Sequence, residues 1–168
     1  MRQPLIRIAL LGALILANPV GARADGTVLL GLMTLDGPRP SVGVAFGYCP
    51  SVAGFEIEYL GTLGGESANH SSAGGIFGNV IVHPLTIGNL QFFAIGGFGL
   101  WGETFAGGKG TGELGAKDIG GGVKIRLVGR LRLRLDYRLF LLGDPEGASA
   151  VPSTNRPQRF SAGLHVVF

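Results

Sequence analysis

The sequence predicts an all-β protein, an eight-stranded antiparallel transmembrane up-and-down β-barrel. Three observations lead to this prediction. Apolar and polar residues alternate with a period of two in much of residues 129–168, which is the period of a β-strand. The chain has 46% hydrophobic residues and 31 glycines, yet beyond its start it has no apolar run long enough for a spanning helix. The links between the strand-like segments also alternate in length, mostly short then long.

The first 24 residues have the pattern of a cleaved secretory signal peptide. Arg2 and Arg7 accompany an apolar core at residues 8–17, and Ala22-Arg23-Ala24 fits a small-x-small cleavage site. A membrane-anchoring helix is the alternative, but this core is too short to span about 30 Å of hydrocarbon. We therefore expect a signal peptide at residues 1–24 and a barrel at residues 25–168.

The charge balance changes when the signal is removed. The whole chain has 14 Lys and Arg against 11 Asp and Glu, and three of the arginines lie in the signal. The mature chain is therefore formally neutral, and its basic sequence pI is no evidence for a nucleic acid partner.

The first four strands are predicted from alternation of increasing clarity. The first alternates weakly, whereas the second sets valines and aromatics against glycine and alanine. In the third, Glu56 and Glu58 alternate with Phe55, Ile57 and Tyr59. The fourth opposes Ile76, Val80 and Val82 to Phe77, Asn79 and Ile81. The predicted ranges are 27–35, 41–49, 54–63 and 73–84.

The last four strands include the most regular one. The fifth is rich in aromatics and glycines, and its faces are ambiguous. The sixth places Lys124 and Arg126 opposite aliphatic residues. The seventh places leucines on one face and Arg132, Arg134, Asp136 and Arg138 on the other. The eighth ends the chain with Phe160, Leu164, Val166 and Phe168 on one face. The predicted ranges are 90–103, 118–128, 131–141 and 160–168.

The link lengths predict an orientation in the membrane. Links after the second, fourth and sixth strands are short, and links after the third, fifth and seventh are long, while the first link is a short exception. Outer-membrane barrels have short periplasmic turns and longer external loops. We therefore expect both chain ends in the periplasm.

The cost of exposing arginine to lipid predicts which face is inside. In a soluble barrel the leucines would face inward, but in a bilayer an outward arginine near the midplane costs roughly 2–4 kcal/mol. An eight-stranded barrel is narrow enough for side chains to fill, so we expect a packed ionic lumen, with His165 beside it, and not an open pore. The predicted lumen network is Glu56, Glu58, Lys124, Arg126, Arg132, Arg134, Asp136 and Arg138.

Aromatic residues are expected at both membrane interfaces. The expected girdle near the short turns is Tyr48, Phe55, Phe92 and Phe168. The expected girdle near the long loops is Tyr59, Trp101, Phe105 and Phe160.

The chain resembles the small outer-membrane β-barrel family that includes OmpA-type barrels and opacity-like surface antigens. The resemblance lies in the signal and in PSVGVAFGY, GFEIEYLGTLGG, GNVIVHPL, FFAIGGFGLW, IGGGVKIRL and RFSAGLHVVF, which cover most of the mature chain. It implies a bacterial outer-membrane location, a monomer, and contact with membrane lipid and lipopolysaccharide. The alternating end of the chain resembles the signal read by the barrel assembly machinery, formed here by Phe160, Leu164, Val166 and Phe168.

Candidate chemistry is sparse. His70 and Ser72 resemble part of the outer-membrane lipid A deacylase site, but no orienting acid is evident. In GGKGTG a glycine follows Lys109 where a phosphate loop needs Ser or Thr. His83, His165 and the single cysteine, Cys49, show no metal-ligand spacing. We expect no enzyme activity, no cofactor, no metal and no nucleic acid partner.

The sequence favours a structural, surface-presentation or interaction role, with the loops, chiefly residues 143–159, as contact surfaces. Three alternatives stay open at this point. They are a small pore or channel, an outer-membrane lipid-modifying enzyme of the deacylase kind, and a soluble lipocalin-like carrier.

Overall fold

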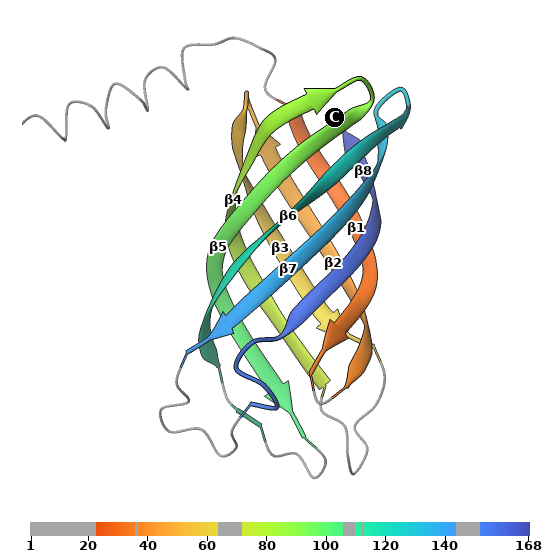
Figure 1. Ribbon diagram of the computed structural model, residues 1–168. Coiled ribbons are helices and arrows are strands. Elements are labelled where there is room, and N and C mark those ends of the chain that lie inside the picture. The colour runs from red at the N-terminus through yellow and green to blue at the C-terminus, as the bar shows by residue number, and fades with distance from the viewer. Residues whose placement is uncertain (1–22, 36, 64–71, 106–109, 112, 144–151) are drawn as a thin grey trace, which may run out of the picture.

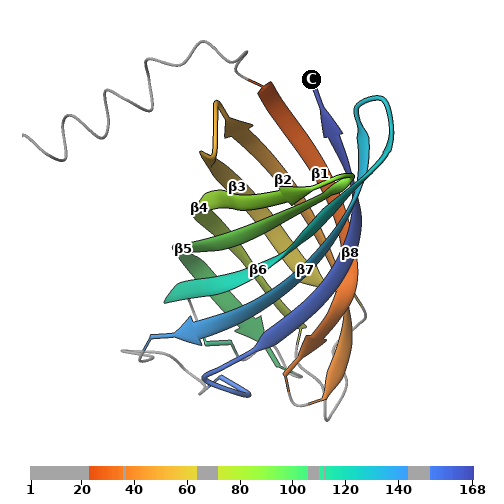
Figure 2. The same ribbon diagram turned by 45° about the horizontal axis from the view of Figure 1, so that its top comes forward.

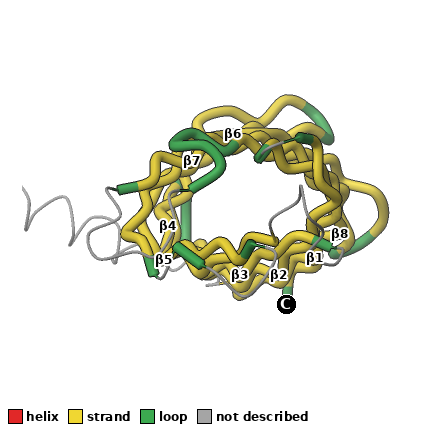
Figure 3. The backbone as a smooth tube through the Cα atoms, turned by 90° about the horizontal axis from the view of Figure 1, so that it is seen from below, coloured by secondary structure: helices red, strands yellow, loops and turns green. Residues whose placement is uncertain are grey.

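The computed structural model describes residues 23–35, 37–63, 72–105, 110–111, 113–143 and 152–168. Eight antiparallel strands form a closed barrel, in which each strand pairs with its sequence neighbours and β1 pairs with β8 (Figures 1 and 3). This arrangement confirms the predicted fold class. The strands are β1 (Arg23–Thr34), β2 (Pro38–Cys49), β3 (Ala53–Thr62), β4 (Ser72–Ile87), β5 (Leu90–Thr104), β6 (Leu114–Val128), β7 (Leu131–Leu142) and β8 (Gln158–Val167).

Several strands extend beyond their predicted ends. β1 begins at Arg23, which pairs with Cys49, so two residues of the predicted signal belong to the barrel. Residues 1–22 lie outside the described residues, and cleavage after Ala24 stays a prediction. β4 continues through Pro84 to Ile87 with a register irregularity between Val82 and Leu85, as expected for a residue that cannot donate to the ladder.

The two ends of the barrel differ in their connections. Gly88 and Gly129 open two-residue turns with φ of 58° and 55°, in the positive region that hairpin turns matching the strand twist require. These turns, the link 50–52 and the chain's C-terminus lie at one end, which we call the turn end (Figure 1). The other four connections lie at the opposite end, the loop end. Between the two ends the strands run obliquely around the barrel axis (Figure 2).

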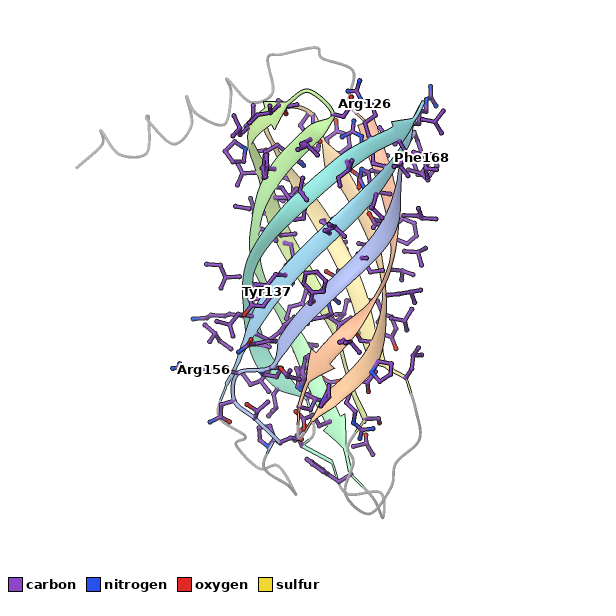
Figure 4. The ribbon with its side chains drawn as sticks, turned by 45° about the vertical axis from the view of Figure 1, so that its right-hand side comes forward. Arg126, Tyr137, Arg156 and Phe168 are labelled. Carbon is purple, nitrogen blue, oxygen red and sulfur yellow. The ribbon has the colours of Figure 1, made fainter. Side chains whose placement is uncertain are left out.

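Apolar side chains cover the outside, and the charged side chains of β7 lie inside. Phe46 and Phe98 are 68% and 75% exposed, whereas Arg134 and Arg138 are 0% exposed. Figure 4 shows side chains projecting outward along the strands. The orientation predicted for the leucines and arginines of β7 is confirmed, and it excludes the soluble carrier, whose barrel would bury its apolar face. No helix within the described ranges is long and apolar enough to cross a membrane.

All the aromatic residues of the predicted girdles except one lie on the outer surface, and their position at the membrane interfaces stays a prediction. Tyr48, Phe55, Tyr59, Phe92, Phe160 and Phe168 are exposed on the outer surface, and Phe105 is partly exposed. Trp101 is only 1% exposed, because it shares the inward face of β5 with Phe93 and Ile95. The expectation that Trp101 lies in the outer girdle was therefore wrong.

Candidate functional site: the barrel lumen

The inward side chains form three successive layers along the barrel. The order is given by β7, on which Arg132, Arg134, Asp136, Arg138 and Phe140 follow one another from the turn end toward the loop end. The basic mouth at the turn end comprises Lys124, Arg126 and Arg132. The ionic layer comprises Glu56, Glu58, Asn79, Asp118, Arg134, Asp136, Arg138 and Arg159. The apolar layer comprises Met33, Leu60, Ala73, Phe77, Trp101, Leu114, Ala116 and Phe140.

Arg134 links two strands of the ionic layer. Its Nη1 lies 2.5 Å from Glu56 Oε2 on β3, and its Nη2 lies 2.6 Å from Asp136 Oδ2 on its own strand. Its Nε also donates to Asp136 Oδ2, at 3.1 Å. A guanidinium carries five donors in a fixed planar fork, so it can hold two carboxylates at once.

Arg138 is the centre of the ionic layer. Its Nε lies 3.0 Å from Asp136 Oδ1, and its Nη2 lies 3.2 Å from Glu56 Oε1 and 3.1 Å from Glu58 Oε2. Its Nη1 forms a further ion pair with Asp118 on β6. One guanidinium thus contacts four carboxylates from three strands. This satisfies a buried charge that would be costly without partners.

Two residues from other strands complete the ionic layer. Arg159 on β8 pairs with Glu58. With its amide nitrogen turned toward Asp118, Asn79 on β4 donates to Oδ1 at 2.9 Å and accepts from Arg138 Nη1 at 3.3 Å. The layer therefore draws residues from β3, β4, β6, β7 and β8 and crosses the whole lumen.

Glycine makes room for the long arginines. A Cβ at Gly120 would lie 2.1 Å from the carbonyl oxygen of Tyr137 and 2.7 Å from Cδ of Arg138. A Cβ at Gly43 would lie 3.2 Å from Glu58 Oε1 and 3.4 Å from Arg159 Nη1. Both positions face the ionic layer, so a side chain at Gly120 would clash with the β7 backbone, and one at Gly43 would press on Glu58 and Arg159.

The apolar layer is packed around aromatic rings. The ring centroid of Phe140 lies 5.2 Å from that of Phe77 and 5.4 Å from that of Trp101. Both separations are typical of favourable aromatic pairs. The rings come from β4, β5 and β7, so they fill the lumen between the ionic layer and the loops.

Glu103 fastens the loop end above this layer. Its Oε2 accepts hydrogen bonds from Ser153 N at 3.0 Å and Ser153 Oγ at 2.6 Å, and its Oε1 accepts one from Trp101 Nε1 at 3.3 Å. Its backbone N donates to Thr111 Oγ1 at 3.0 Å. A single buried residue thus ties two loop segments to β5.

The structure brings together five of the predicted network residues and places three at the turn end. Glu56, Glu58, Arg134, Asp136 and Arg138 lie in the ionic layer. Lys124 is buried nearer the turn end, with Nζ 5.8 Å from the Phe93 ring centroid, and Arg132 Nη1 donates to Gln91 Oε1 at 2.5 Å. His165 faces the lumen, where its Nδ1 lies 2.9 Å from Thr27 Oγ1.

Arg126 departs from the prediction that it joins the lumen network. It is exposed at the turn end (Figure 4), where the register of β6 and β7 shifts between Arg126 and Val128. Arg126 lies on the inward face of β6, but it is so close to the end of the strand that its side chain is exposed. Sequence reasoning also missed Asp118, Arg159, Asn79 and Glu103. Of these, Arg159 continues the inward alternation of Ser161 and His165, a signal present in the sequence.

The structure provides no geometry for the deacylase alternative. His70 lies outside the described residues, and Ser72, at the start of β4, is partly exposed. Across the described part of the chain, no group of three or more His, Cys, Asp or Glu side chains is arranged to hold a metal ion.

Comparison with known proteins identifies the fold. No protein-family model and no curated protein sequence matches the chain. Neisserial surface protein A has a TM-score of 0.68 and 17% identity over 88% of this chain and 97% of its own. The N-terminal β-barrel domain of Pseudomonas aeruginosa OprF has a TM-score of 0.62 and 11% identity over 87% and 97%. Ail of Yersinia pestis, solved with the heparin analogue sucrose octasulfate, has a TM-score of 0.54 and 11% identity over 88% and 99%. The chain therefore has the fold of the small eight-stranded transmembrane β-barrels.

Proposed function

We propose that this chain is a monomeric protein of the bacterial outer membrane that displays its loops from a sealed barrel, with both termini in the periplasm. Its role is structural or in surface interaction, and neither transport nor catalysis. The observation that carries the proposal is the lumen, which an ionic layer and an apolar layer fill in succession.

The outer surface supports a membrane location. A belt of exposed apolar side chains runs around the strands, including Leu30, Phe46, Ile57, Phe98 and Ile119. Closure of the barrel leaves no unpaired sheet edge, which the hydrocarbon core requires. Membrane lipid and lipopolysaccharide are the partners that such a surface fits.

The end of the chain supports delivery by the barrel assembly machinery. Phe160, Leu164, Val166 and Phe168 all face outward and are exposed, as the proposed assembly signal requires. The backbone N of Phe168 donates to the carbonyl of Ala24 at 2.8 Å, so the last residue lies at the β1–β8 seam.

The layers oppose ion passage in different ways. In the ionic layer, Arg134 and Arg138 are held by carboxylates from β3, β6 and β7, so an ion entering this layer meets charged groups that are already paired. In the apolar layer, Phe77, Trp101 and Phe140 offer little to replace the hydration shell of an ion. Hydrophobic constrictions of this kind close channels by excluding water.

Conductance in planar lipid bilayers tests the sealed lumen. The purified barrel should give no steady unitary currents under conditions in which a porin reconstituted in the same way conducts. An Arg138→Gln variant separates lumen currents from membrane defects, because this residue lies inside the barrel. Steady currents from the wild type that change in size in this variant would refute the proposal.

A further inference from the structure

A small recess at the turn end is lined by cations and neutral polar groups. Its volume is about 50 Å³, enough for a few water molecules or one compact oxyanion. None of the described residues that line it carries a carboxylate. The residues that line it include Thr86, Asn89, Gln91, Lys124, Arg126 and Arg132.

Lys124 is a buried cation without a counter-ion in contact. It is 2% exposed, and its Nζ makes no hydrogen bond or salt bridge with any described residue. Glu56 is engaged by two arginines, Arg134 and Arg138. Asp25 also faces the turn end of the lumen, but no salt bridge joins it to Lys124 among the described residues. Its one close partner is the Phe93 ring, with Nζ 5.8 Å from the ring centroid, so an anion in the recess would add the counter-charge that this largely buried ammonium group lacks.

The strand register places two further cations beside each other at the same recess. Arg126 on β6 is the direct cross-strand partner of Arg132 on β7, and both line the recess. Like charges directly opposite on neighbouring strands are destabilising. Arg132 is oriented by its hydrogen bond to Gln91, whose own cross-strand partner is Lys124. The sheet thus brings three cationic side chains to one recess, and an anion bound between them would reduce their mutual electrostatic repulsion.

We propose that this recess binds a phosphate group, either that of a phospholipid headgroup of the facing leaflet or free phosphate. Guanidinium groups match phosphate oxygens with paired donors, and an ammonium group adds a point charge. The small volume admits the phosphate itself and leaves any larger part of the ligand outside. The proposed phosphate site lies at the turn end, outside the ionic and apolar layers. The proposal therefore does not depend on whether the barrel conducts ions.

Calorimetric titration of the purified barrel with inorganic phosphate tests the site. The detergent is an amine oxide, which contains no phosphate, and chloride keeps the ionic strength constant. Lys124→Gln and Arg126→Gln should each weaken binding about tenfold or more, the loss expected for one charge-assisted contact. Arg130→Gln is the matched control, because it removes the same charge from the exposed turn between β6 and β7 and does not line the recess. Its affinity should stay within about twofold of the wild type.

A second titration distinguishes the two sources of phosphate. Micelles containing phosphatidylglycerol are compared with micelles containing uncharged diacylglycerol. Binding of phosphatidylglycerol alone, weakened by Lys124→Gln and Arg126→Gln, assigns the site to a lipid headgroup, and comparable binding of inorganic phosphate assigns it to the free ion. Absence of binding in both titrations overturns the proposal. Equal weakening by Arg130→Gln also overturns it, because the attraction would then be general and not confined to the recess.

Discussion

Replacing Arg138 by methionine should destabilise the barrel more than any exposed arginine substitution. The change removes the one group that contacts Glu56, Glu58, Asp118 and Asp136 together, and leaves these carboxylates with fewer counter-charges. Breaking a buried ion pair from one side costs about 3–5 kcal/mol. We expect a loss of that size in the free energy of unfolding, which is a large share of the roughly 5–15 kcal/mol of an ordinary domain.

Urea unfolding in phosphatidylcholine vesicles measures this loss. The chain has one tryptophan, Trp101, and it is buried beside Phe140 in the lumen, so its fluorescence reports on barrel integrity. Arg156→Met is the matched control, because this arginine is exposed at the loop end (Figure 4). Its effect should stay within about 0.5 kcal/mol.

A double variant tests whether the loss comes from uncompensated charge. Adding Asp118→Asn to Arg138→Met removes one of the orphaned carboxylates, and the two changes should couple by about 1 kcal/mol or more in the stabilising direction. A loss below about 1 kcal/mol for Arg138→Met alone would refute the reasoning, because the ionic layer would then be hydrated or replaceable. If the changes in unfolding free energy of the two substitutions simply add in the double variant, the explanation by uncompensated charge is refuted, although the destabilisation by Arg138→Met would stand.

Three further predictions concern packing, lipid contact and orientation. Gly99→Ala should destabilise the barrel by about 1–3 kcal/mol, because its Cβ would lie 2.0 Å from the Ile76 carbonyl oxygen, while Gly115→Ala, with no atom within 4 Å, should be neutral in urea unfolding. Leu164→Arg should cost about 2–4 kcal/mol in the same assay, and a neutral result would place this face away from lipid. On intact cells, a bulky membrane-impermeant maleimide should label the Arg156→Cys, Cys49→Ser double variant at its one cysteine. The wild-type protein, whose one cysteine is Cys49, should be labelled only after the outer membrane is opened. The reverse pattern would show that the proposed orientation is inverted.

Most of the barrel was predictable from the sequence because, on β7, the alternation of residues and the free-energy cost of exposing arginine to lipid indicate the same inward face. An arginine at positions 134 and 138 has only one tolerable side in a bilayer, so a single regular strand determines the polarity of the whole barrel. The third strand adds Glu56 and Glu58, which carry the opposite charge and lie on the face of their strand that is not apolar. Closure of the barrel then brings β3 and β7 to face each other across the lumen, so these charges meet in one layer. The partner of each arginine was not predictable, because β3 and β7 do not pair and their relative depth depends on the register of every strand between them.

The remaining errors have local causes. Glycines at positions 96, 97 and 99 interrupt the alternation of β5, so the inward face of Trp101 is recognisable only from the register with β4 and β6. Arg159 follows a polar segment containing Pro157, which hides its membership of β8. Arg126 has the predicted parity but lies beyond the ion pairs, because periodicity reports the face of a strand and not its depth along the barrel.

The order of the layers makes the two ends of the lumen chemically unequal. At the turn end, the recess presents Lys124 and the cross-strand pair of Arg126 and Arg132, and no described carboxylate lines it. Deeper in, the guanidinium groups of Arg134 and Arg138 are already engaged, and beyond them the apolar layer supplies no counter-charge. A ligand that enters from the turn end therefore has favourable contacts only at the mouth and none that would draw it through. The same order separates the loops from the ionic layer, so a change of loop sequence away from the Glu103 contacts does not reach the buried ion pairs.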